Sequence, residues 1–285
     1  MVLPTPKLTG AIAFQGALGA YSHIACMEAV PDWNPLPCAS FEDAFEAVER
    51  EDADLAMIPI ENSQAGRVAD IHLLLPQSDL HIVGEHFHRV RHCVLGLPDA
   101  KIEDVEFARS HPQALAQCRA RLRGLKIAPL AHSDTANAAK QVVADGDPKV
   151  AAIASKLAGE VYGLKTLIEH AEDIDHNTTR FVILAREPIT PNPVDGAIMT
   201  TLVFQVRNVP AALFKALGGF ATNGVNMTKL ESYQRGGSFS ASEFFTDIEG
   251  HPSDRNVALA MEELNFHTRW VRILGSYTQQ RGRGV

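Results

Sequence analysis

The chain has 285 residues, 46% of them hydrophobic and 21% charged, with a formal net charge of −8. This length suits two domains of unequal size, and the composition is that of a globular protein rather than a disordered one. The sequence has no apolar run that could span a bilayer, no basic cluster for nucleic-acid phosphates and no secretory signal in residues 1–10. These features argue against a membrane or nucleic-acid partner and lead us to expect a cytoplasmic protein.

Residues 11–185 alternate between strand and helix signals, the pattern of mainly parallel sheets with helices on both faces. We expect strands over 11–15, 54–60, 105–108, 126–130, 150–153 and 179–185, and helices over 21–29, 41–50, 67–75, 112–122 and 135–144. Ser110 and Asp134 are the expected N-caps of the last two helices. The extended stretch 81–97 is long for one strand, so it should cross between two hinged α/β lobes that enclose a cleft.

Residues 187–196 form the clearest linker, because this segment has three prolines, one glycine and no periodic apolar pattern. The element order changes after it. We expect strands over 198–206, 225–233, 239–248 and 268–274, helices over 210–220 and 256–264, and a turn at Gly236–Gly237. This βαββαβ order predicts a ferredoxin-like sandwich of one antiparallel sheet and two helices.

Three segments gather polar groups beside predicted strands, and one of them, Pro59–Arg67, lies at the carboxyl end of a strand, where parallel sheets bind ligands. In Phe14–Ser22, two glycines stand before a helix whose free N–H groups would attract a phosphate or carboxylate. A plain tight turn is the alternative there, and the pattern is neither a dinucleotide fingerprint nor a P-loop. Pro59–Arg67 combines carboxylate, amide, hydroxyl and guanidinium groups, and His176–Phe181 places hydrogen-bonding groups in consecutive positions. Local capping of solvated turns is the alternative for Pro59–Arg67.

The cysteines and one group of histidines raise the question of a metal centre. Cys26, Cys38, Cys93 and Cys118 form no C-x-x-C pair, so we expect four reduced thiols. The spacing of His86, His88 and His92 could place three imidazoles on one face of a strand, as in a metal site. We favour a polar face exposed to solvent, because the nearest additional ligands would point the opposite way. The sequence therefore predicts no metal.

Taken together, the segments resemble the prephenate dehydratase family of phenylalanine biosynthesis. The motifs occur in family order: FQGALGAYS at 14–22, PIENSQAGRV at 59–68, SHPQALAQC at 110–118, DTANAAK at 134–140 and HNTTRF at 176–181. The segment GVNMTKLESY at 224–233 resembles the ACT regulatory domain. The resemblance implies a two-lobed, periplasmic-binding-protein-like α/β catalytic domain over 8–187, a linker over 188–196 and an ACT domain over 197–285. Lobe 1 would take about 8–88 and 170–187, and lobe 2 about 89–169.

The resemblance implies a cofactor-free carbon–oxygen lyase that converts prephenate to phenylpyruvate with loss of CO2 and water. Motif matching assigns catalytic roles to Asn62, Ser63, Thr179 and Arg180. The Thr179 hydroxyl would hydrogen-bond the departing oxygen, and Arg180 would clamp a carboxylate. The expected substrate-binding residues are Ala20, Tyr21, Ser22, Glu61, Ser110, Gln113 and Phe181, although Phe181 could be core and Glu61 structural.

Two alternatives stay open for the catalytic segment. A dehydratase that prefers arogenate, the transaminated analogue, would carry the same motifs. A non-catalytic two-lobed binding protein would share the hinged architecture, but the intact Thr179-Arg180-Phe181 segment and the absence of an export signal disfavour it.

The resemblance to ACT domains implies regulation by phenylalanine and self-association as a dimer or tetramer. The expected effector-binding residues are Ala211, Ala212, Leu213, Asn226, Met227, Glu231 and Ser232. Two departures separate the sequence from phenylalanine-inhibited relatives: Ala211 stands where they have glycine, and Tyr233-Gln234 replace Arg-Pro. A dimerisation module without an effector is the alternative.

Overall fold

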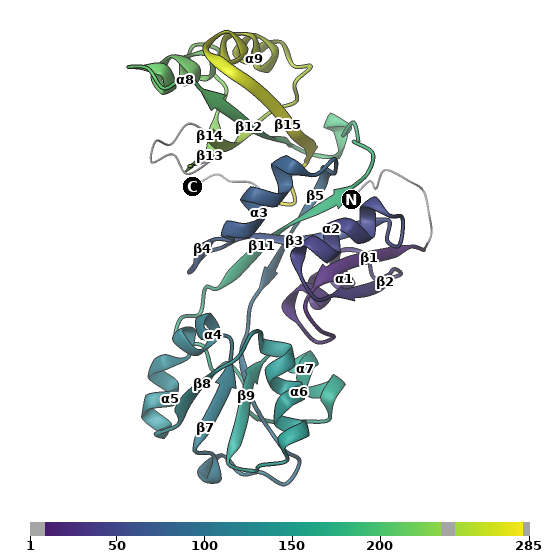
Figure 1. Ribbon diagram of the computed structural model, residues 1–285, viewed down its shortest axis with the longest axis vertical. Coiled ribbons are helices and arrows are strands. Elements are labelled where there is room, and N and C mark those ends of the chain that lie inside the picture. The colour runs from purple at the N-terminus through teal and green to yellow at the C-terminus, as the bar shows by residue number, and fades with distance from the viewer. Residues whose placement is uncertain (1–8, 235–242, 282–285) are drawn as a thin grey trace. The chain divides into compact units, whose positions relative to one another are not determined.

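The computed structural model describes residues 9–234 and 243–281. The chain divides into two compact units. Figure 1 labels their helices and strands. The first unit comprises residues 8–68 and 86–181, and the second comprises residues 69–85 and 182–285. Within the described ranges, no helix is both long enough and apolar enough to cross a membrane.

One mostly buried sheet has the strand order β2-β1-β3-β11-β5. Its strands are β1 (Ala11–Gln15), β2 (Asn34–Cys38), β3 (Leu55–Asn62), β5 (His81–Arg89) and β11 (Thr178–Ala185), and the short β4 (Gly66–Arg67) pairs with the end of β3. β1 is parallel to both of its neighbours, β2 and β3. The helices α1 (Tyr21–Ala29) and α2 (Phe41–Glu49) follow β1 and β2, and a capping box between Ser40 and Asp43 begins α2.

A second sheet, entirely within the first unit, has the order β10-β6-β9-β7-β8. Its strands are β6 (Cys93–Gly96), β7 (Phe107–Ser110), β8 (Ala128–Ala131), β9 (Val150–Ala154) and β10 (Lys165–Ile168). The helices α4 (Pro112–Gln117) and α5 (Arg119–Leu125) cover one face, and α6 (Thr135–Asp145) and α7 (Lys156–Tyr162) cover the other (Figure 1). All five residues of β9 are buried, because alternate side chains enter the two helix-covered cores.

The second unit contains the predicted βαββαβ order. The elements are β12 (Ile198–Val206), α8 (Ala212–Thr222), β13 (Met227–Tyr233), β14 (Glu243–Glu249), α9 (Arg255–His267) and β15 (Thr268–Thr278). The antiparallel sheet has the order β13-β14-β12-β15, and α8 and α9 pack on one face of it. The expected Gly236–Gly237 turn lies outside the described residues. The mixed α/β fold is thus confirmed.

A short helix from the first half of the chain packs against the other face of this antiparallel sheet. It is α3 (Ala69–Leu74), which continues into a 3-10 turn, Leu75–Gln77. The imidazole of His72 stacks on Tyr233 with ring centroids 5.1 Å apart and meets the edge of Phe245 at 4.7 Å. From β15, Arg272 donates hydrogen bonds to the carbonyls of Pro76 and Ser78.

Several local features differ from the sequence-based expectations. The helix expected over 112–122 is two helices, because the backbone leaves helical geometry at Cys118. Ser110 is not the N-cap of α4, because His111 caps this helix by accepting a hydrogen bond from the Gln113 amide at Nδ1. Ser110 is the last residue of β7, and its hydroxyl donates to the Ile153 carbonyl at 2.6 Å. The Asp134 cap of α6 is confirmed, since its carboxylate accepts from the Asn137 amide at 2.7 Å. The strands β2 and β10 and the helix α7 were not expected.

Candidate active site

A pocket of about 320 Å³ lies within the first unit. The start of α1, the β3–β4 turn, the start of β11, the segment after β5 and helix α4 all contribute to its wall. Its polar lining includes Tyr21, Ser22, Asn62, Arg67, His92, His111, Gln113, Gln117, Asp134 and Thr179. Most of these groups are neutral hydrogen-bonding side chains.

The start of α1 presents unsatisfied backbone donors to the pocket. Its N-cap, Ala20, has an extended backbone and no side-chain cap, and Ala20, Tyr21 and Ser22 line the pocket. The chain reaches this turn through Gly19, whose φ is +87° and where a Cβ would lie 2.6 Å from the Ala158 Cα. Free N–H groups at a helix start favour an anion, so this turn suits a carboxylate.

Asn62 connects the end of β3 with the start of β11. Its Oδ1 accepts hydrogen bonds from the backbone amides of Gln64 and Ala65, each at 3.0 Å. Its Nδ2 donates to Asn177 Oδ1 at 2.7 Å and to Thr179 Oγ1 at 3.0 Å. The Thr179 oxygen therefore accepts from Asn62, and its hydroxyl proton is left to donate elsewhere.

A second set of hydrogen bonds joins α1 to α4. Tyr21 Oη and His92 Nδ1 are 2.7 Å apart, His92 Nε2 and Gln117 Oε1 are 2.8 Å apart, and Asn177 Nδ2 donates to the same Gln117 oxygen at 3.1 Å. Burial lowers the pKa of His92 and raises the pKa of Tyr21 well above its ordinary value. Both side chains are thus neutral at physiological pH.

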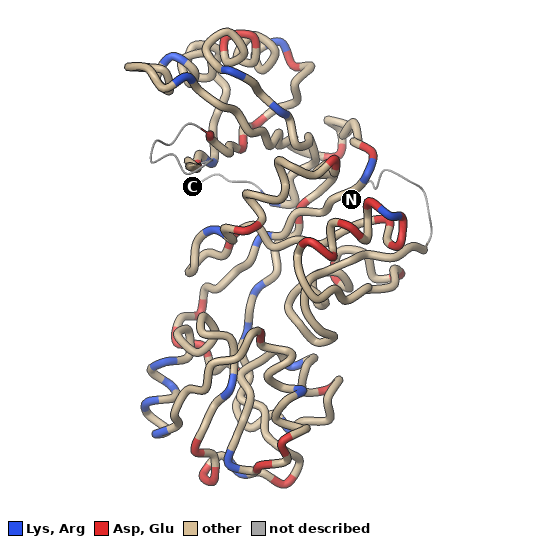
Figure 2. Tube along the Cα trace, viewed as in Figure 1, with Lys and Arg blue, Asp and Glu red and all other residues tan. Residues whose placement is uncertain are grey.

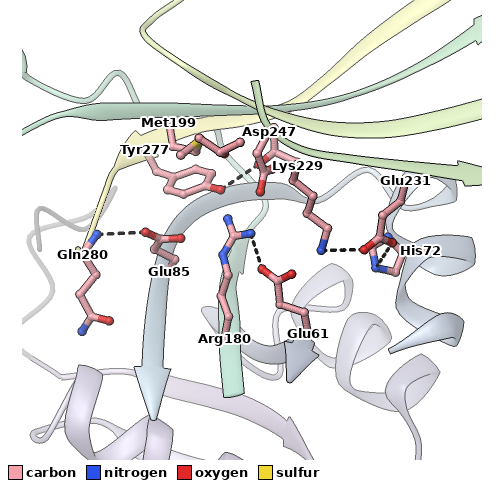
Figure 3. Close-up of polar contacts among 12 residues, drawn as sticks. Glu61, His72, Glu85, Arg180, Met199, Lys229, Glu231, Asp247, Tyr277 and Gln280 are labelled. Carbon is pink, nitrogen blue, oxygen red and sulfur yellow. Dashed lines mark hydrogen bonds and ion pairs between the residues drawn. The ribbon is translucent and has the colours of Figure 1, made fainter. Parts of the chain in front are cut away.

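Seven of the expected site residues line this pocket: Ala20, Tyr21, Ser22, Asn62, Gln113, Thr179 and Phe181. The structure places the other four elsewhere. Arg180 is 2% exposed, and its Nη1 lies 2.9 Å from the Glu61 carboxylate. Figure 3 draws this ion pair as a dashed line. Ser63 binds the 176–178 backbone, and Ser110 is buried in β7. None of these four residues, Glu61, Ser63, Ser110 and Arg180, lines the pocket.

Among the polar residues of the pocket named above, the sequence analysis assigned no site role to Arg67, His92, His111, Gln117 and Asp134. A signal existed for Gln117, because it follows Gln113 by four residues and so shares its side of α4. Arg67 belongs to the PIENSQAGRV motif at 59–68, but the sequence analysis gave it no role. His92 gave no signal beyond its spacing from the other histidines.

The interpretation of the three histidines as a solvent-exposed face is wrong. His86, His88 and His92 are 7%, 9% and 1% exposed, respectively. The first two imidazoles contact one carboxylate oxygen of Glu28, at 2.8 and 2.9 Å. Their polar atoms are satisfied by protein partners, which is why burial is tolerated. Among the described residues, no cluster of three or more histidine, cysteine or acidic side chains is arranged to hold a metal.

The expected effector residues lie in the second unit, in three short stretches of the sequence. Ala211 caps α8 in a left-handed conformation, φ 60°, and Ala212 and Leu213 follow it. Asn226 and Met227 stand at the start of β13, and Asn226 Nδ2 donates to Glu249 at 3.1 Å. Further along β13, Glu231 lies near His72 and Lys229 (Figure 3), while the neighbouring Ser232 is exposed.

Charge is not gathered into one basic surface on the described residues. Figure 2 shows Lys and Arg scattered among Asp and Glu, with acidic residues along α2 and basic residues along α5. Arg67 is the one Lys or Arg among the described residues that line the pocket. An anionic ligand is therefore attracted by donors within the pocket itself.

Comparison with known proteins matches residues 12–189 to the family model described as prephenate dehydratase. A bifunctional N-acyl-homoserine lactone acylase/prephenate dehydratase from Komagataeibacter europaeus is 51% identical over 93% of this chain and 95% of its own length. Arogenate dehydratase/prephenate dehydratase 1, chloroplastic, from Arabidopsis thaliana is 41% identical over 93% of this chain and 71% of its own.

Two solved structures are similar over almost the whole chain, and one of them is a prephenate dehydratase. A prephenate dehydratase from Arthrobacter aurescens in complex with L-Phe has a TM-score of 0.86 and 30% identity, covering 94% of this chain and 89% of its own. A structure described as a novel type of quorum quenching acylase has a TM-score of 0.89 and 49% identity, covering 96% and 100%. The chain therefore belongs to the prephenate dehydratase family of carbon–oxygen lyases.

Proposed function

We propose that the pocket of the first unit converts prephenate to phenylpyruvate. The observation that carries this proposal is the Asn62–Thr179 hydrogen bond inside the pocket of a chain that matches the family over residues 12–189. In the reaction the bond to the ring carboxylate breaks, CO2 leaves, and its electron pair enters the ring as the ring C–O bond breaks. The departing hydroxide takes up a proton and leaves as water.

Aromatisation supplies the driving force, so the protein's main task is to orient the substrate and assist the departing oxygen. Because Asn62 donates to Thr179 Oγ1, the Thr179 hydroxyl can donate to that oxygen. A threonine hydroxyl is too weak an acid to give up its proton fully near pH 7. It instead stabilises the charge that develops on the oxygen, and water completes the protonation.

The two carboxylates of prephenate need partners as well. The amides at the start of α1 and the guanidinium of Arg67 are the donors on the pocket wall that suit an anion. Arg180 supports this arrangement indirectly, by holding Glu61 beside Asn62 at the end of β3.

Arogenate differs from prephenate in its side chain, where an ammonium-bearing carbon replaces the keto group. Incubation of the purified chain with each compound, followed by separation of phenylpyruvate from phenylalanine, distinguishes the two activities. We expect a higher kcat/KM with prephenate. Turnover of arogenate alone would contradict the proposed substrate, and turnover of neither would contradict the proposed function.

We also infer that the second unit carries an ACT-type domain that binds L-phenylalanine as an inhibitor. Support comes from its βαββαβ sheet and from the similar Arthrobacter aurescens structure in complex with L-Phe. The proposed contacts are Ala211, Ala212, Leu213, Asn226 and Met227, with Glu231 and Ser232 further along β13. Calorimetric titration paired with an inhibition assay tests this role; no heat and no inhibition would contradict it.

The antiparallel sheet also bears on assembly. β13 and β15 are its edge strands, and such edges pair readily with a second copy. We propose a cytoplasmic dimer or tetramer. Light scattering coupled to size-exclusion chromatography gives the mass of the assembly, and a monomer would contradict the proposal.

A second activity is favoured by similarity to the Komagataeibacter europaeus relative and to the acylase structure. That activity would be hydrolysis of the amide bond of an N-acyl-homoserine lactone. Release of homoserine lactone and fatty acid, measured by mass spectrometry beside the dehydratase assay, tests it. Dehydratase turnover without release would restrict this chain to the first activity.

A further inference from the structure

Six side chains of the first unit form one continuous set of hydrogen bonds through the pocket wall. In order of contact they are Tyr21, His92, Gln117, Asn177, Asn62 and Thr179. Asn177 is 0% and His92 is 1% exposed, so water does not compete for the bonds at the centre of the set. Three of the six were assigned no role by the sequence.

The backbone fixes the direction of these bonds at one end. Asn62 Oδ1 accepts from the amides of Gln64 and Ala65, which can only donate. Asn62 must therefore present Nδ2 to its other two partners, Asn177 and Thr179. The orientation of the Asn62 side-chain amide therefore follows from its two backbone partners, which can act only as donors.

Each next assignment follows from the one before it. Because Asn177 Oδ1 accepts from Asn62, its Nδ2 faces Gln117 and donates to Oε1 at 3.1 Å. Gln117 Oε1 is then an acceptor, so His92 Nε2, 2.8 Å away, must carry a proton. A neutral His92 with a proton on Nε2 has a bare Nδ1, which lies 2.7 Å from the Tyr21 oxygen. The single proton of the Tyr21 hydroxyl has a second acceptor in reach, the Arg91 carbonyl at 2.9 Å, but a bare Nδ1 can only accept, so in this arrangement the proton points to His92.

Gln117 Oε1 thus receives two hydrogen bonds, one from His92 and one from Asn177. If the Gln117 amide were reversed, its NH2 group would face the N–H donors of His92 and Asn177 and could accept a hydrogen bond from neither. The carbonyl end of Gln117 is consequently held by the protein, and its Nε2 group is the end available to a ligand in the pocket that Gln117 lines.

We propose that Tyr21 and His92 are positioning residues of the dehydratase site, which fix Gln117 as a hydrogen-bond donor toward the substrate. The proposal rests on the proposed function of the pocket. The same network makes Thr179 Oγ1 an acceptor from Asn62, so the pocket presents two oriented donors, Gln117 Nε2 and the Thr179 hydroxyl. Donors fixed before the reaction stabilise developing negative charge without reorganising.

The tautomer of His92 is the direct test, and it needs no turnover. In protein labelled with ¹⁵N-histidine, the signals of His92 are identified by their loss in the His92→Gln variant. We expect a neutral imidazole with the proton on Nε2 at neutral pH. A proton on Nδ1 alone would contradict the direction of the hydrogen bonds, whatever the outcome of the activity assay.

Kinetics with prephenate test the positioning role. His92→Gln can place an amide N–H where Nε2 stood, whereas His92→Asn, an equally neutral amide, is too short to reach Gln117. We expect His92→Gln to keep kcat within about twofold and His92→Asn to lower it about tenfold, with KM little changed. His81→Asn, on β5 outside the pocket, is the control and should keep the full kcat.

A double-mutant cycle separates positioning from mere structural support. In a Gln117→Leu background, His92→Asn should cost less than about twofold in kcat, because its effect passes through Gln117. Equal losses in both backgrounds, or equal kcat for His92→Gln and His92→Asn, would overturn the proposal. If the unaltered chain does not turn over prephenate, the proposed function fails, and the tautomer measurement alone decides the hydrogen-bond network.

Discussion

Arg67 is the residue on which we expect binding of the substrate carboxylate to depend most. It follows the Asn62 turn, on the short strand β4, and lines the pocket. Arg67→Gln should raise KM for prephenate about tenfold or more, because a charge-assisted hydrogen bond is lost, with a smaller effect on kcat. Arg50→Gln on the exposed end of α2 is the control. Equal KM values for the two variants would show that Arg67 does not hold the substrate.

Arg180 should matter for stability more than for binding. Its guanidinium is buried and pairs with Glu61 at 2.9 Å, away from the pocket lining. Arg180→Leu leaves a partly buried carboxylate without this partner, so we expect the free energy of unfolding to fall by about 3 kcal/mol. Urea denaturation gives this value. An unchanged midpoint with a sharply raised KM would instead support the carboxylate clamp suggested by the sequence.

The placement of Arg180 could have been read from strand alternation. Successive side chains of a strand point to opposite faces, and Thr179 and Phe181 line the pocket on either side of Arg180. The same alternation separates Glu61 from Asn62 on β3. Motif matching identified segments that line the pocket, but it ignored the face on which each side chain lies. The hydrogen bonds of His92 could not be predicted, because its partners are far away in the sequence.

At the scale of elements, the start of α8 carries local strain. Ala211 adopts φ 60° and ψ 12°, a left-handed conformation that a Cβ disfavours. Ala211→Gly should therefore raise the free energy of unfolding by about 0.5–1 kcal/mol, despite the greater freedom of glycine in the unfolded chain.

Ala216→Gly is the matched control, because Ala216 lies inside α8 and is buried. That change should lower the stability by about 1 kcal/mol. Urea denaturation of both variants decides the point. If both lose stability, the left-handed conformation at Ala211 is not strained.

The packing of α3 against β13 should make stability depend on pH. Burial opposes ionisation of Glu231, but the hydrogen bond from Tyr233 and the nearby charges of Lys229 and His72 together lower its pKa below the ordinary 4.5. A carboxyl whose pKa is lower in the folded state stabilises that state fully above its unfolded pKa, and this stability is lost as the pH falls through the folded value.

Tyr233→Phe removes the 2.6 Å hydrogen bond to Glu231 while keeping the ring that stacks on His72. The loss of stability between pH 7 and about pH 3 should be smaller in this variant than in the unaltered protein. Thermal denaturation at the two pH values measures the difference. A larger loss in the variant would contradict the assigned pKa direction.

Elements with strong local signals were predicted from the sequence, and elements held by distant contacts were not. β1 and β12 have the expected bounds because apolar and β-branched residues predominate in both. β2 contains Pro35 and Pro37, which argue against a strand, yet it is tolerated as the edge of its sheet. The short β10 is paired only with β6, far away in the sequence, so local pattern gave no reason to expect it.

On the scale of the whole molecule, the compact units do not follow the order of the sequence. The prolines of residues 187–196 suggested a boundary there, but residues 69–85 join the C-terminal part of the chain in one unit. The contacts responsible include those of Arg272 with Pro76 and Ser78, and the Gln280 amide with Glu85 at 3.0 Å. Such contacts join residues almost two hundred positions apart, which no local pattern reveals.

The central claim is that the pocket around Thr179 removes the hydroxyl group of prephenate. The most direct measurement is phenylpyruvate formation by Thr179→Val, with Thr178→Val as the matched control on the preceding position of β11. We predict a fall in kcat of about 100-fold for Thr179→Val, because a donor to the departing oxygen is lost, and a change within about twofold for Thr178→Val. A folded Thr179→Val variant that keeps the kcat of the unaltered protein would contradict the account.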